Sequence, residues 1–245
     1  MWDKAAVQRY EEWLQTPEGA FALGREKRLL AHLISGWPRR GQRLLEVGCG
    51  SGLFLEMFWE AGFDTTGLDL SPHMLAAARA RVNTRVDLHL GSADLLPFDD
   101  KEFDFVALIT VLEFVPDPLA ALEEAFRVAR KGLLVAFLNR YSLYYLGNGL
   151  RLPFCRPSNL RAARWFTPQE MRAQLHAVAV GKTHTSRSVL PGPLWSWKQT
   201  VPWRWLNGLI FPGCVGAWCA TRVDFHPEKQ LTPLYAFSAQ PRISG

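Results

Sequence analysis

The stretch Leu44–Gly52 reads LLEVGCGSG, and the sequence GLDLS follows it at Gly67–Ser71. The apolar run before Gly48 predicts a buried strand, and the glycines after it predict a tight turn that lets a ligand approach the backbone. A second short strand would end at Asp69, whose carboxylate can accept hydrogen bonds from two neighbouring hydroxyls. This pattern is typical of a βαβ unit that binds a nucleoside.

The spacing of the glycines indicates which kind of nucleoside the loop suits. A dinucleotide-binding loop has glycine at its first, third and sixth positions, so that a pyrophosphate can sit at the helix N-terminus. Here Gly48, Gly50 and Gly52 stand at alternate positions, and the sixth position is Leu53. Glu46 adds negative charge at the mouth of the loop, which favours a cationic amino-acid tail over a diphosphate. Taken alone, the segment could also be an ordinary strand-to-helix turn.

Length and composition predict one α/β core with an appended lid, because the chain has 245 residues of which 48% are hydrophobic. The four cysteines have no C-x-x-C spacing, so we expect reduced thiols and no metal site. The charged N-terminus does not resemble a signal peptide. The uncharged stretch Trp205–Thr221 contains Pro212 and is too short to span a bilayer. We therefore expect a soluble, cytoplasmic protein.

Charge is distributed unevenly along the chain. Residues 1–129 hold 20 acidic and 13 basic side chains, whereas residues 130–245 hold 3 acidic and 15 basic ones. The basic part also contains six tryptophans. A basic surface with tryptophans predicts contact with an anionic partner, such as peripheral contact with an anionic membrane surface. A solvated basic face over an aromatic core is the alternative.

Hydrophobic periodicity predicts alternating strands and helices over residues 43–138, and hence a parallel sheet with right-handed crossovers. The pairs Ser71–Pro72, Asp117–Pro118 and Thr167–Pro168 predict helix starts, because each places a capping side chain before a proline. We expect strands over 43–47, 65–69, 86–90, 104–109, 132–138, about 178–185 and about 233–239. We expect helices over 5–15, 18–34, 52–61, 72–81, 117–130 and 168–176.

The E-x-G-x-G-x-G run at Glu46–Gly52 resembles motif I of class I S-adenosylmethionine-dependent methyltransferases. With the segments described below, residues 41–139 resemble the type 11 branch, which includes quinone-precursor methyltransferases. The resemblance implies that S-adenosylmethionine is the cofactor. It also implies that Glu46 and the backbone of Gly48, Cys49 and Gly50 hold its methionine portion.

Two further segments resemble this branch on the nucleoside side. GLDLSPHML at Gly67–Leu75 is similar to the family pattern G-x-D-x-S-x-x-M-L, which implies that Asp69 holds the ribose hydroxyls and that Leu70 and Met74 line the adenine slot. GSADLLPF at Gly91–Phe98 resembles G-D-A-x-x-L-P-F, in which the aspartate binds the adenine amino group.

This chain departs from the second pattern, because Ser92 stands where the aspartate usually is. Either the Ser92 hydroxyl or Asp94 would then accept from the adenine amino group. The Ala93 N–H would still meet a ring nitrogen, because that contact involves only the backbone.

On the methyl side, the strand over 104–109 should end at the loop Thr110–Val115. Thr110 and Phe114 are expected to line the cofactor, and Glu113 is the best-placed general base. Alternatively, Glu113 is an acid at the start of a helix, or one that faces the cofactor, and does not act as a base. His184 is a second candidate base, although a strand histidine can simply be satisfied by hydrogen bonds.

Several aromatic residues could complete the site. Tyr10 lies in a stretch similar to the cofactor-covering segment of this branch, and we expect it either to close over the methionine end or to pack in the core. Tyr141, Tyr144 and Tyr145 could line the acceptor pocket or serve packing alone.

The resemblance implies an α/β, Rossmann-like, doubly wound fold with a seven-stranded, mostly parallel sheet whose last strand is antiparallel. Residues 1–40 would form a helical cofactor-covering segment. Residues 41–245 would form the methyltransferase domain, with lid insertions near 140–166 and 187–231.

The predicted function is methyl transfer from S-adenosylmethionine to a small hydrophobic or anionic acceptor, such as a quinone precursor, a lipid or an aromatic metabolite. The alternative is an RNA-directed methyltransferase or an RNA-binding protein that uses the basic C-terminal half. No recognised RNA motif supports that alternative, so we do not expect a nucleic-acid partner. A dinucleotide-dependent oxidoreductase is disfavoured by Leu53.

Overall fold

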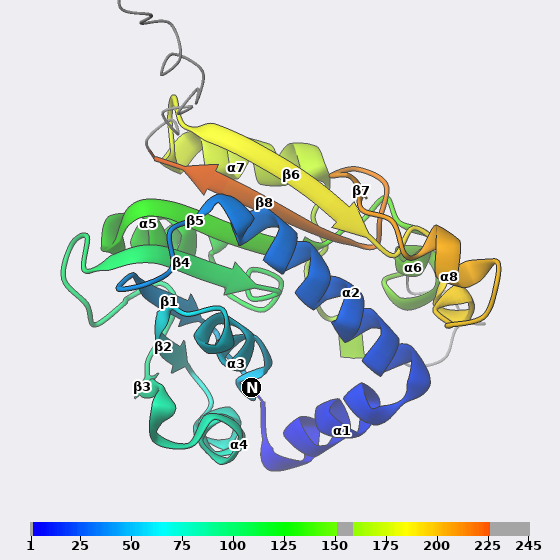
Figure 1. The fold of residues 1–245 in the computed structure, drawn as a ribbon, viewed down its shortest axis with the longest axis horizontal. Helices are drawn as coiled ribbons and strands as arrows, with labels where there is room; N and C mark the ends of the chain where they lie inside the picture. The colour runs from blue at the N-terminus through cyan, green and yellow to red at the C-terminus, as the bar shows by residue number, and fades with distance from the viewer. Residues whose placement is uncertain (1, 151–158, 226–245) are drawn as a thin grey trace, which may run out of the picture.

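An eight-stranded sheet forms the centre of the protein (Figure 1). The computed structural model describes residues 2–150 and 159–225. The strand order across the sheet is β3-β2-β1-β4-β5-β8-β6-β7. In chain order the strands are β1 (Arg43–Val47), β2 (Asp64–Asp69), β3 (Asp87–Leu90), β4 (Phe103–Ile109), β5 (Ala129–Leu138), β6 (Thr183–Val189), β7 (Phe211–Pro212) and β8 (Trp218–Asp224).

The first five strands are mutually parallel, and β8 runs antiparallel to both β5 and β6. The chain builds outward from β1 to β3 and then returns to β4 on the other side of β1. In open parallel sheets the crevice at such a reversal, at the carboxyl ends of the strands, is where ligands bind. The expected doubly wound, mostly parallel α/β fold is confirmed, and β7 is a short additional edge strand.

Helices cover both faces of the sheet, with α2 and α3 on one face and α5 and α7 on the other (Figure 1). The predicted caps form, since Ser71 Oγ accepts the Met74 N–H and the Thr167 and Glu170 side chains form a capping box. The α-helices are α1 (Lys4–Gln15), α2 (Pro17–Leu33), α3 (Leu53–Glu60), α4 (Pro72–Val82), α5 (Pro118–Val128), α6 (Leu143–Asn148), α7 (Pro168–Val178) and α8 (Trp203–Leu206). Short 3-10 helices are η1 (Ile34–Gly36), η2 (Asn83–Arg85), η3 (Asn159–Arg161) and η4 (Leu194–Ser196).

Two strand predictions in the C-terminal part were misplaced or fall outside the described structure. The strand expected at about 178–185 is β6, which begins at Thr183 because α7 continues to Val178 and Gly181 turns the chain with a φ of +71°. The strand expected at 233–239 lies outside the described residues. The antiparallel strand β8 comes earlier, at Trp218–Asp224, inside the stretch expected to form a lid.

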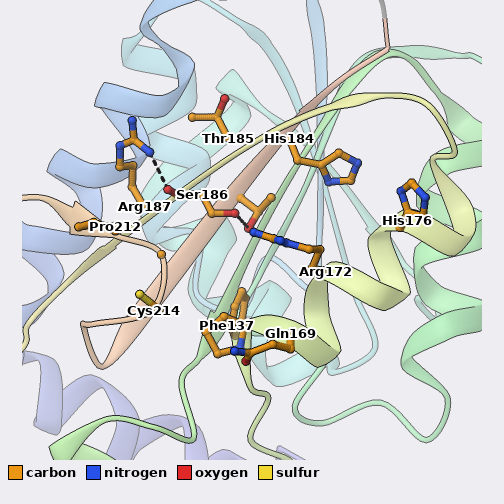
Figure 2. Close-up of a pocket in the computed structure, with 13 residues that line it drawn as sticks. Phe137, Gln169, Arg172, His176, His184, Thr185, Ser186, Arg187, Pro212 and Cys214 are labelled. Atoms are coloured by element: carbon orange, nitrogen blue, oxygen red, sulfur yellow. Dashed lines mark hydrogen bonds between the residues drawn. The ribbon is translucent and has the colours of Figure 1, made fainter.

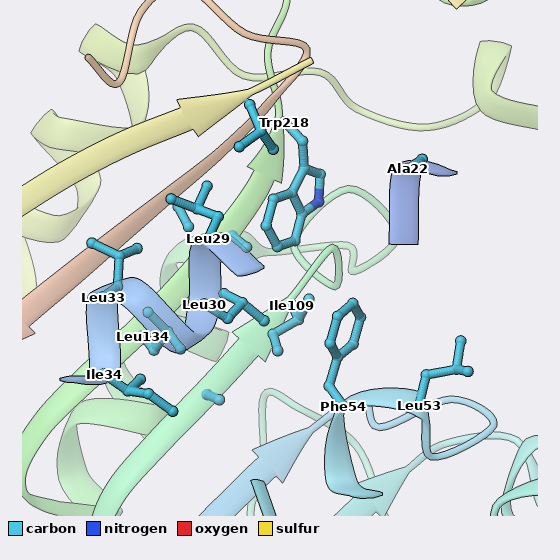
Figure 3. Packing of buried hydrophobic residues seen from close by; sticks show 14 of the residues in the cluster. Ala22, Leu29, Leu30, Leu33, Ile34, Leu53, Phe54, Ile109, Leu134 and Trp218 are labelled. Atoms are coloured by element: carbon cyan, nitrogen blue, oxygen red, sulfur yellow. The ribbon is translucent and has the colours of Figure 1, made fainter. Parts of the chain in front are cut away.

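The core on the α2 side of the sheet fixes the N-terminal helices in place. Figure 3 shows Leu29, Leu30 and Leu33 of α2 facing the strands, near Leu134 of β5 and Trp218 of β8. Burying side chains of this size stabilises the fold by about 1.5–3 kcal/mol each. The helical segment therefore packs as part of the main core.

Polar contacts complete the sheet. Asp104, expected to be a structural acid, is buried; it accepts the Arg43 N–H and forms an ion pair with Lys131. None of the helices described has the length and apolar character needed to cross a membrane.

Candidate active site

The glycine loop after β1 adopts a backbone shape that only glycine accepts easily. Gly48, Gly50 and Gly52 have φ angles of +67°, +52° and +81°. A Cβ atom on Gly48 would lie 2.5 Å from Val111 Cγ2, so the absence of a side chain is also a steric requirement. The Cys49 N–H donates to the Leu68 carbonyl, which holds the loop against β2.

Asp69 sits at the carboxyl end of β2 and faces this loop. Its two carboxylate oxygens accept the Gly50 N–H and the Ser71 N–H, both at 2.8 Å. Burial raises the pKa of Asp69, and the hydrogen bonds from Ser71 and Gly50 oppose that shift. Each oxygen keeps a second lone pair, so the half-buried carboxylate can still accept from a ligand diol.

Glu46 is the other carboxylate of the loop region, and it is fully buried at the end of β1. Its Oε2 atom has no hydrogen-bond partner among the described residues. Burial and the neighbouring Asp69 raise the pKa of Glu46 well above its usual value. An unpaired buried carboxylate is costly, and a ligand ammonium group would relieve that cost.

The N-terminal segment covers this region. Ser71 Oγ donates to the Trp2 carbonyl, and the Trp2 ring makes edge contacts with Tyr10 at 5.7 Å and with Phe114 at 5.8 Å. Burial raises the pKa of Tyr10, and the Glu26, Glu11 and Glu46 carboxylates raise it further. The predicted residues Tyr10, Glu46 and Phe114 are therefore brought to one place.

Arg81 of α4 ties the covering helix to the loop and was not identified from sequence. Its Nε donates to the Ser51 carbonyl at 2.9 Å, and its Nη2 forms an ion pair with Glu11 of α1 at 2.9 Å. An isolated arginine on a helix carries no sequence signal for such a bridge.

On the expected adenine side, the Ser92 hydroxyl donates to the Asp94 carboxylate. The two residues between which the sequence could not choose therefore act as a pair. Met74 is buried against the glycine loop, and its sulfur would lie 3.9 Å from a Cβ atom added to Gly50. Ala93 is also buried. Leu70 stays exposed.

Arg127 holds the chain that follows Asp94. Its guanidinium donates to the Leu96 carbonyl at 3.1 Å and the Phe98 carbonyl at 2.8 Å. It also forms ion pairs with Asp100 and Glu124.

The loop after β4 is strained and tightly anchored. Thr110 has a φ of +55°, and its Oγ1 accepts the indole N–H of Trp218 at 2.9 Å. Such conformations in residues other than glycine are uncommon and tend to cluster at functional sites.

Glu113 is buried in this loop and links it to β5. Its Oε1 accepts the Leu138 N–H at 2.6 Å, while Oε2 has no partner among the described residues. Burial raises the pKa of Glu113 to about 8, although the hydrogen bond from Leu138 opposes the shift. Glu113 Oε1 therefore has a structural role, and the use of Glu113 as a general base stays a prediction.

Glu26 of α2 is a second carboxyl group that the sequence analysis missed. Burial raises its pKa to about 7, and its charge raises the pKa values of Tyr10 and Tyr144 beyond the effect of their own burial. Glu26 therefore lies near both tyrosines. In the sequence, Glu26 looks like an ordinary solvated acid on an amphipathic helix.

The other candidates fall into two groups. Tyr144 is buried against Trp197, with ring centroids 4.7 Å apart, and Tyr145 packs on Trp165, whereas Tyr141 is exposed. His184 does not lie at the carboxyl edge of the parallel strands. It is level with Val223 of β8 and, across β8, with Leu133 near the start of β5, whereas the carboxyl end of β5 is at Leu138. Among the described residues no group of His, Cys, Asp and Glu side chains could hold a metal ion.

These features fit S-adenosylmethionine. The glycine loop leaves room for close approach to the backbone, Asp69 offers acceptors for a diol, and Glu46 offers an unpaired acceptor for an ammonium group. A pyrophosphate would meet the buried Glu46 and half-buried Asp69 carboxyl groups at the same place.

Comparison with known proteins agrees with this geometry. Residues 45–137 match the model of a methyltransferase domain, the type 11 family. Over 135 residues the chain is 38% identical to a malonyl-[acyl-carrier protein] O-methyltransferase from Serratia marcescens, covering 54% of this chain and 51% of that protein. Over 109 residues it is 38% identical to a ubiquinone biosynthesis O-methyltransferase from Hydrogenovibrio crunogenus, covering 42% and 45%.

The chain thus spans about half the length of these curated relatives. A solved S-adenosylmethionine-dependent methyltransferase from Thermotoga maritima superimposes with a TM-score of 0.72 at 25% identity, covering 92% of this chain and all of that one. The loop, the carboxylate at 69, the fold and the relatives agree. Residues 45–137 match a methyltransferase domain, within a fold similar to that of a solved S-adenosylmethionine-dependent methyltransferase.

Proposed function

We propose that the chain transfers the methyl group of S-adenosylmethionine to a small hydrophobic or anionic acceptor, such as a quinone precursor, a lipid or an aromatic metabolite. The observation that carries the proposal is the glycine loop bracketed by Glu46 and Asp69. The O-methyltransferase relatives support a small-molecule acceptor, and they give no support to the RNA alternative.

S-adenosylmethionine, when bound, would supply an electrophilic methyl group on its sulfonium for transfer to the acceptor. The protein would contribute mainly position and exclusion of water. The contacts of Trp2 with Tyr10 and Phe114 support closure of the N-terminal segment over the site. Tyr10, Glu46, Met74 and Phe114 would then line the cofactor, together with Thr110.

Glu113 stays the proposed general base, and we propose Glu26 as a second candidate. A carboxyl group with a pKa of about 7 can take a proton from a hydroxyl near neutral pH. The Glu26 carboxyl group forms no hydrogen bond among the described residues, whereas Glu113 Oε1 accepts the Leu138 N–H. Glu26→Gln should lower methyl transfer at least tenfold and leave S-adenosylhomocysteine affinity unchanged, whereas Glu18→Gln on the same helix should change neither.

The acceptor class can be tested with radiolabelled S-adenosylmethionine and fractionated cell extracts. The proposal predicts label in lipid-soluble compounds or in small organic acids, with none in RNA. Label confined to RNA would favour the alternative, and label only in cationic or neutral polar metabolites would contradict the acceptor class.

A hydrophobic, basic surface supports contact with an anionic membrane. We call it the Trp-rich face: Val201, Trp205 and Leu209 are 70%, 69% and 58% exposed, and Trp195 lies beside them in the sequence. Burial lowers the pKa of Arg25, and the adjacent charges of Arg28 and Arg204 lower it further, so three guanidinium groups lie close together. Arg28 also donates to the Gly208 carbonyl. Tryptophan and arginine together suit the headgroup region of a membrane.

Co-sedimentation with vesicles tests this contact. Anionic vesicles should retain the protein and neutral ones should not, and salt should weaken the binding. Val201→Ser should reduce retention severalfold, while Val180→Ser, at a valine that is equally exposed but lies elsewhere, should leave it unchanged. Equal effects of the two variants would contradict the assignment of this face. The proposal places the reaction in the cytoplasm, where thiols such as Cys49 stay reduced.

A further inference from the structure

A second pocket lies on the α7 side of the sheet, away from the glycine loop (Figure 2). Its volume is about 680 Å³, and its walls come from α7, β6, β8 and the turn after β7. Strand residues alternate between faces, so His184, Ser186 and Thr221 point toward α7. Phe137 closes the floor.

The pocket is lined by basic side chains, and no acidic residue is among its described lining residues. Arg172 and His176 come from α7 and His184 comes from β6. Within residues 2–150 and 159–225 no carboxylate forms an ion pair with Arg172. Arg187 also lines the pocket, but Figure 2 shows its guanidinium directed away from Arg172.

Uncharged donors face the same space. Ser186 Oγ and Thr221 Oγ1 are 2.8 Å apart and share one hydrogen bond, so one of the two hydroxyl hydrogens stays available. Figure 2 shows Arg172 extending from α7 toward this pair. Gln169 adds an amide at the N-terminal end of α7.

His184 is the residue that points most directly to a ligand. Both of its ring nitrogens are buried without a hydrogen-bond partner among the described residues. Partial burial lowers the pKa of His184, and the nearby His176 and Arg172 lower it further, although the nearby Ala179 backbone opposes the shift. Ring nitrogens left without partners inside a half-buried side chain are costly, and a ligand oxygen would supply a missing partner.

We propose that this pocket binds a phosphate ester, with the phosphate group between Arg172, His176 and His184 and the organic part against Phe137 and Pro212. A phosphate presents three terminal oxygens and about two negative charges, which matches donors that converge from a helix and two strands. The pocket is larger than a free phosphate requires, so it leaves room for the esterified group. This inference goes beyond the proposed methyl transfer and does not depend on it.

Calorimetric titration of the full chain with phenyl phosphate tests the proposal, with inorganic phosphate and benzoate as comparison ligands. Phenyl phosphate should bind at one site, more tightly than either of the other two. Arg172→Ala should weaken that binding by about tenfold or more, because it removes charge-assisted hydrogen bonds. Arg172→Lys, which keeps the charge and loses the planar fork, should fall between.

Arg40→Ala is the matched control, because it removes the same charge from an exposed arginine far along the chain. It should leave phenyl phosphate binding unchanged, and every variant should keep S-adenosylhomocysteine affinity, which shows that it is folded. An equal loss in the two alanine variants would overturn the proposal. So would equal affinities for phenyl phosphate and benzoate, or inorganic phosphate binding as tightly as the ester.

Discussion

Substituting Gly48 by alanine tests whether the glycine loop is shaped by steric need. Gly48 has a φ of +67°, and its added Cβ would lie 2.5 Å and 2.8 Å from the two methyl carbons of Val111. Gly41 has nearly the same φ, +69°, but nothing lies within 4 Å of its added Cβ. The two positions therefore differ mainly in the contact with Val111.

The expected losses of unfolding free energy follow from two terms, the left-handed backbone conformation and the contact with Val111. A left-handed backbone costs an alanine roughly 1–2 kcal/mol, which a less flexible unfolded chain partly offsets by about 0.4–1 kcal/mol. The Gly41→Ala variant should thus lose about 1 kcal/mol of unfolding free energy. Gly48→Ala should lose about 1–3 kcal/mol more, because forced overpacking in a buried region adds that cost.

Urea unfolding of the two variants measures this difference, and calorimetry with S-adenosylhomocysteine measures the effect on the site. Gly48→Ala should also weaken the nucleoside ligand, whereas Gly41→Ala should not. The double variant Gly48→Ala with Val111→Ala should recover part of the loss in a double-mutant cycle, since the clashing methyl groups are gone. Equal destabilisation by the two glycine variants, with no recovery in the cycle, would refute the steric argument.

Three further outcomes are expected. Asp69→Asn should weaken the binding of S-adenosylhomocysteine at least about tenfold in calorimetry, because an amide N–H₂ would face the Gly50 or Ser71 N–H. Asp87→Asn, on the exposed edge of β3, should have no effect on this binding. Burial raises the pKa of Glu113 to about 8, above its unfolded value of about 4.3, so the folded protein holds this proton more tightly and loses stability as pH rises through that range. Glu113→Gln should remove most of that loss, on the order of 5 kcal/mol, in urea titrations at pH values on either side of the window. An unchanged pH dependence would rule out the assignment. Arg127→Ala should lower the unfolding free energy by about 1–2 kcal/mol and weaken S-adenosylhomocysteine binding severalfold, because the Leu96 and Phe98 carbonyls lose their donor. Arg130→Ala, at an exposed arginine nearby, should change neither quantity.

The N-terminal two thirds of the fold could be predicted because its signals are local. Proline after a capping residue marks the start of α4, α5 and α7, and the apolar runs of β1 and β4 mark buried parallel strands. The glycine loop and Asp69 could be identified for the same reason, since turn, strand end and carboxylate follow one another in sequence.

The C-terminal strands carry no such signal. The strand β6 reads THTSRSV, in which His184 and Ser186 face the pocket beside α7, and β8 is preceded by a stretch rich in Pro, Gly and Trp. Pairing between β5, β8 and β6 determines both strands, and that pairing is a long-range property.

The missed site residues are also defined only in three dimensions. Arg81 reaches the glycine loop from α4, and Glu26 comes near Tyr10 from α2, only after folding. Glu113 was predicted as a site residue, but its bond to the Leu138 N–H, which spans two strand ends, was not.

The most direct test of the central claim is titration of the purified chain with S-adenosylhomocysteine and, separately, with NAD. The account predicts saturable one-to-one binding of S-adenosylhomocysteine and no detectable heat with NAD, because the buried Glu46 and half-buried Asp69 carboxyl groups flank the loop where a pyrophosphate would sit. Binding of NAD with comparable affinity, or no binding of S-adenosylhomocysteine by the folded chain, would contradict it.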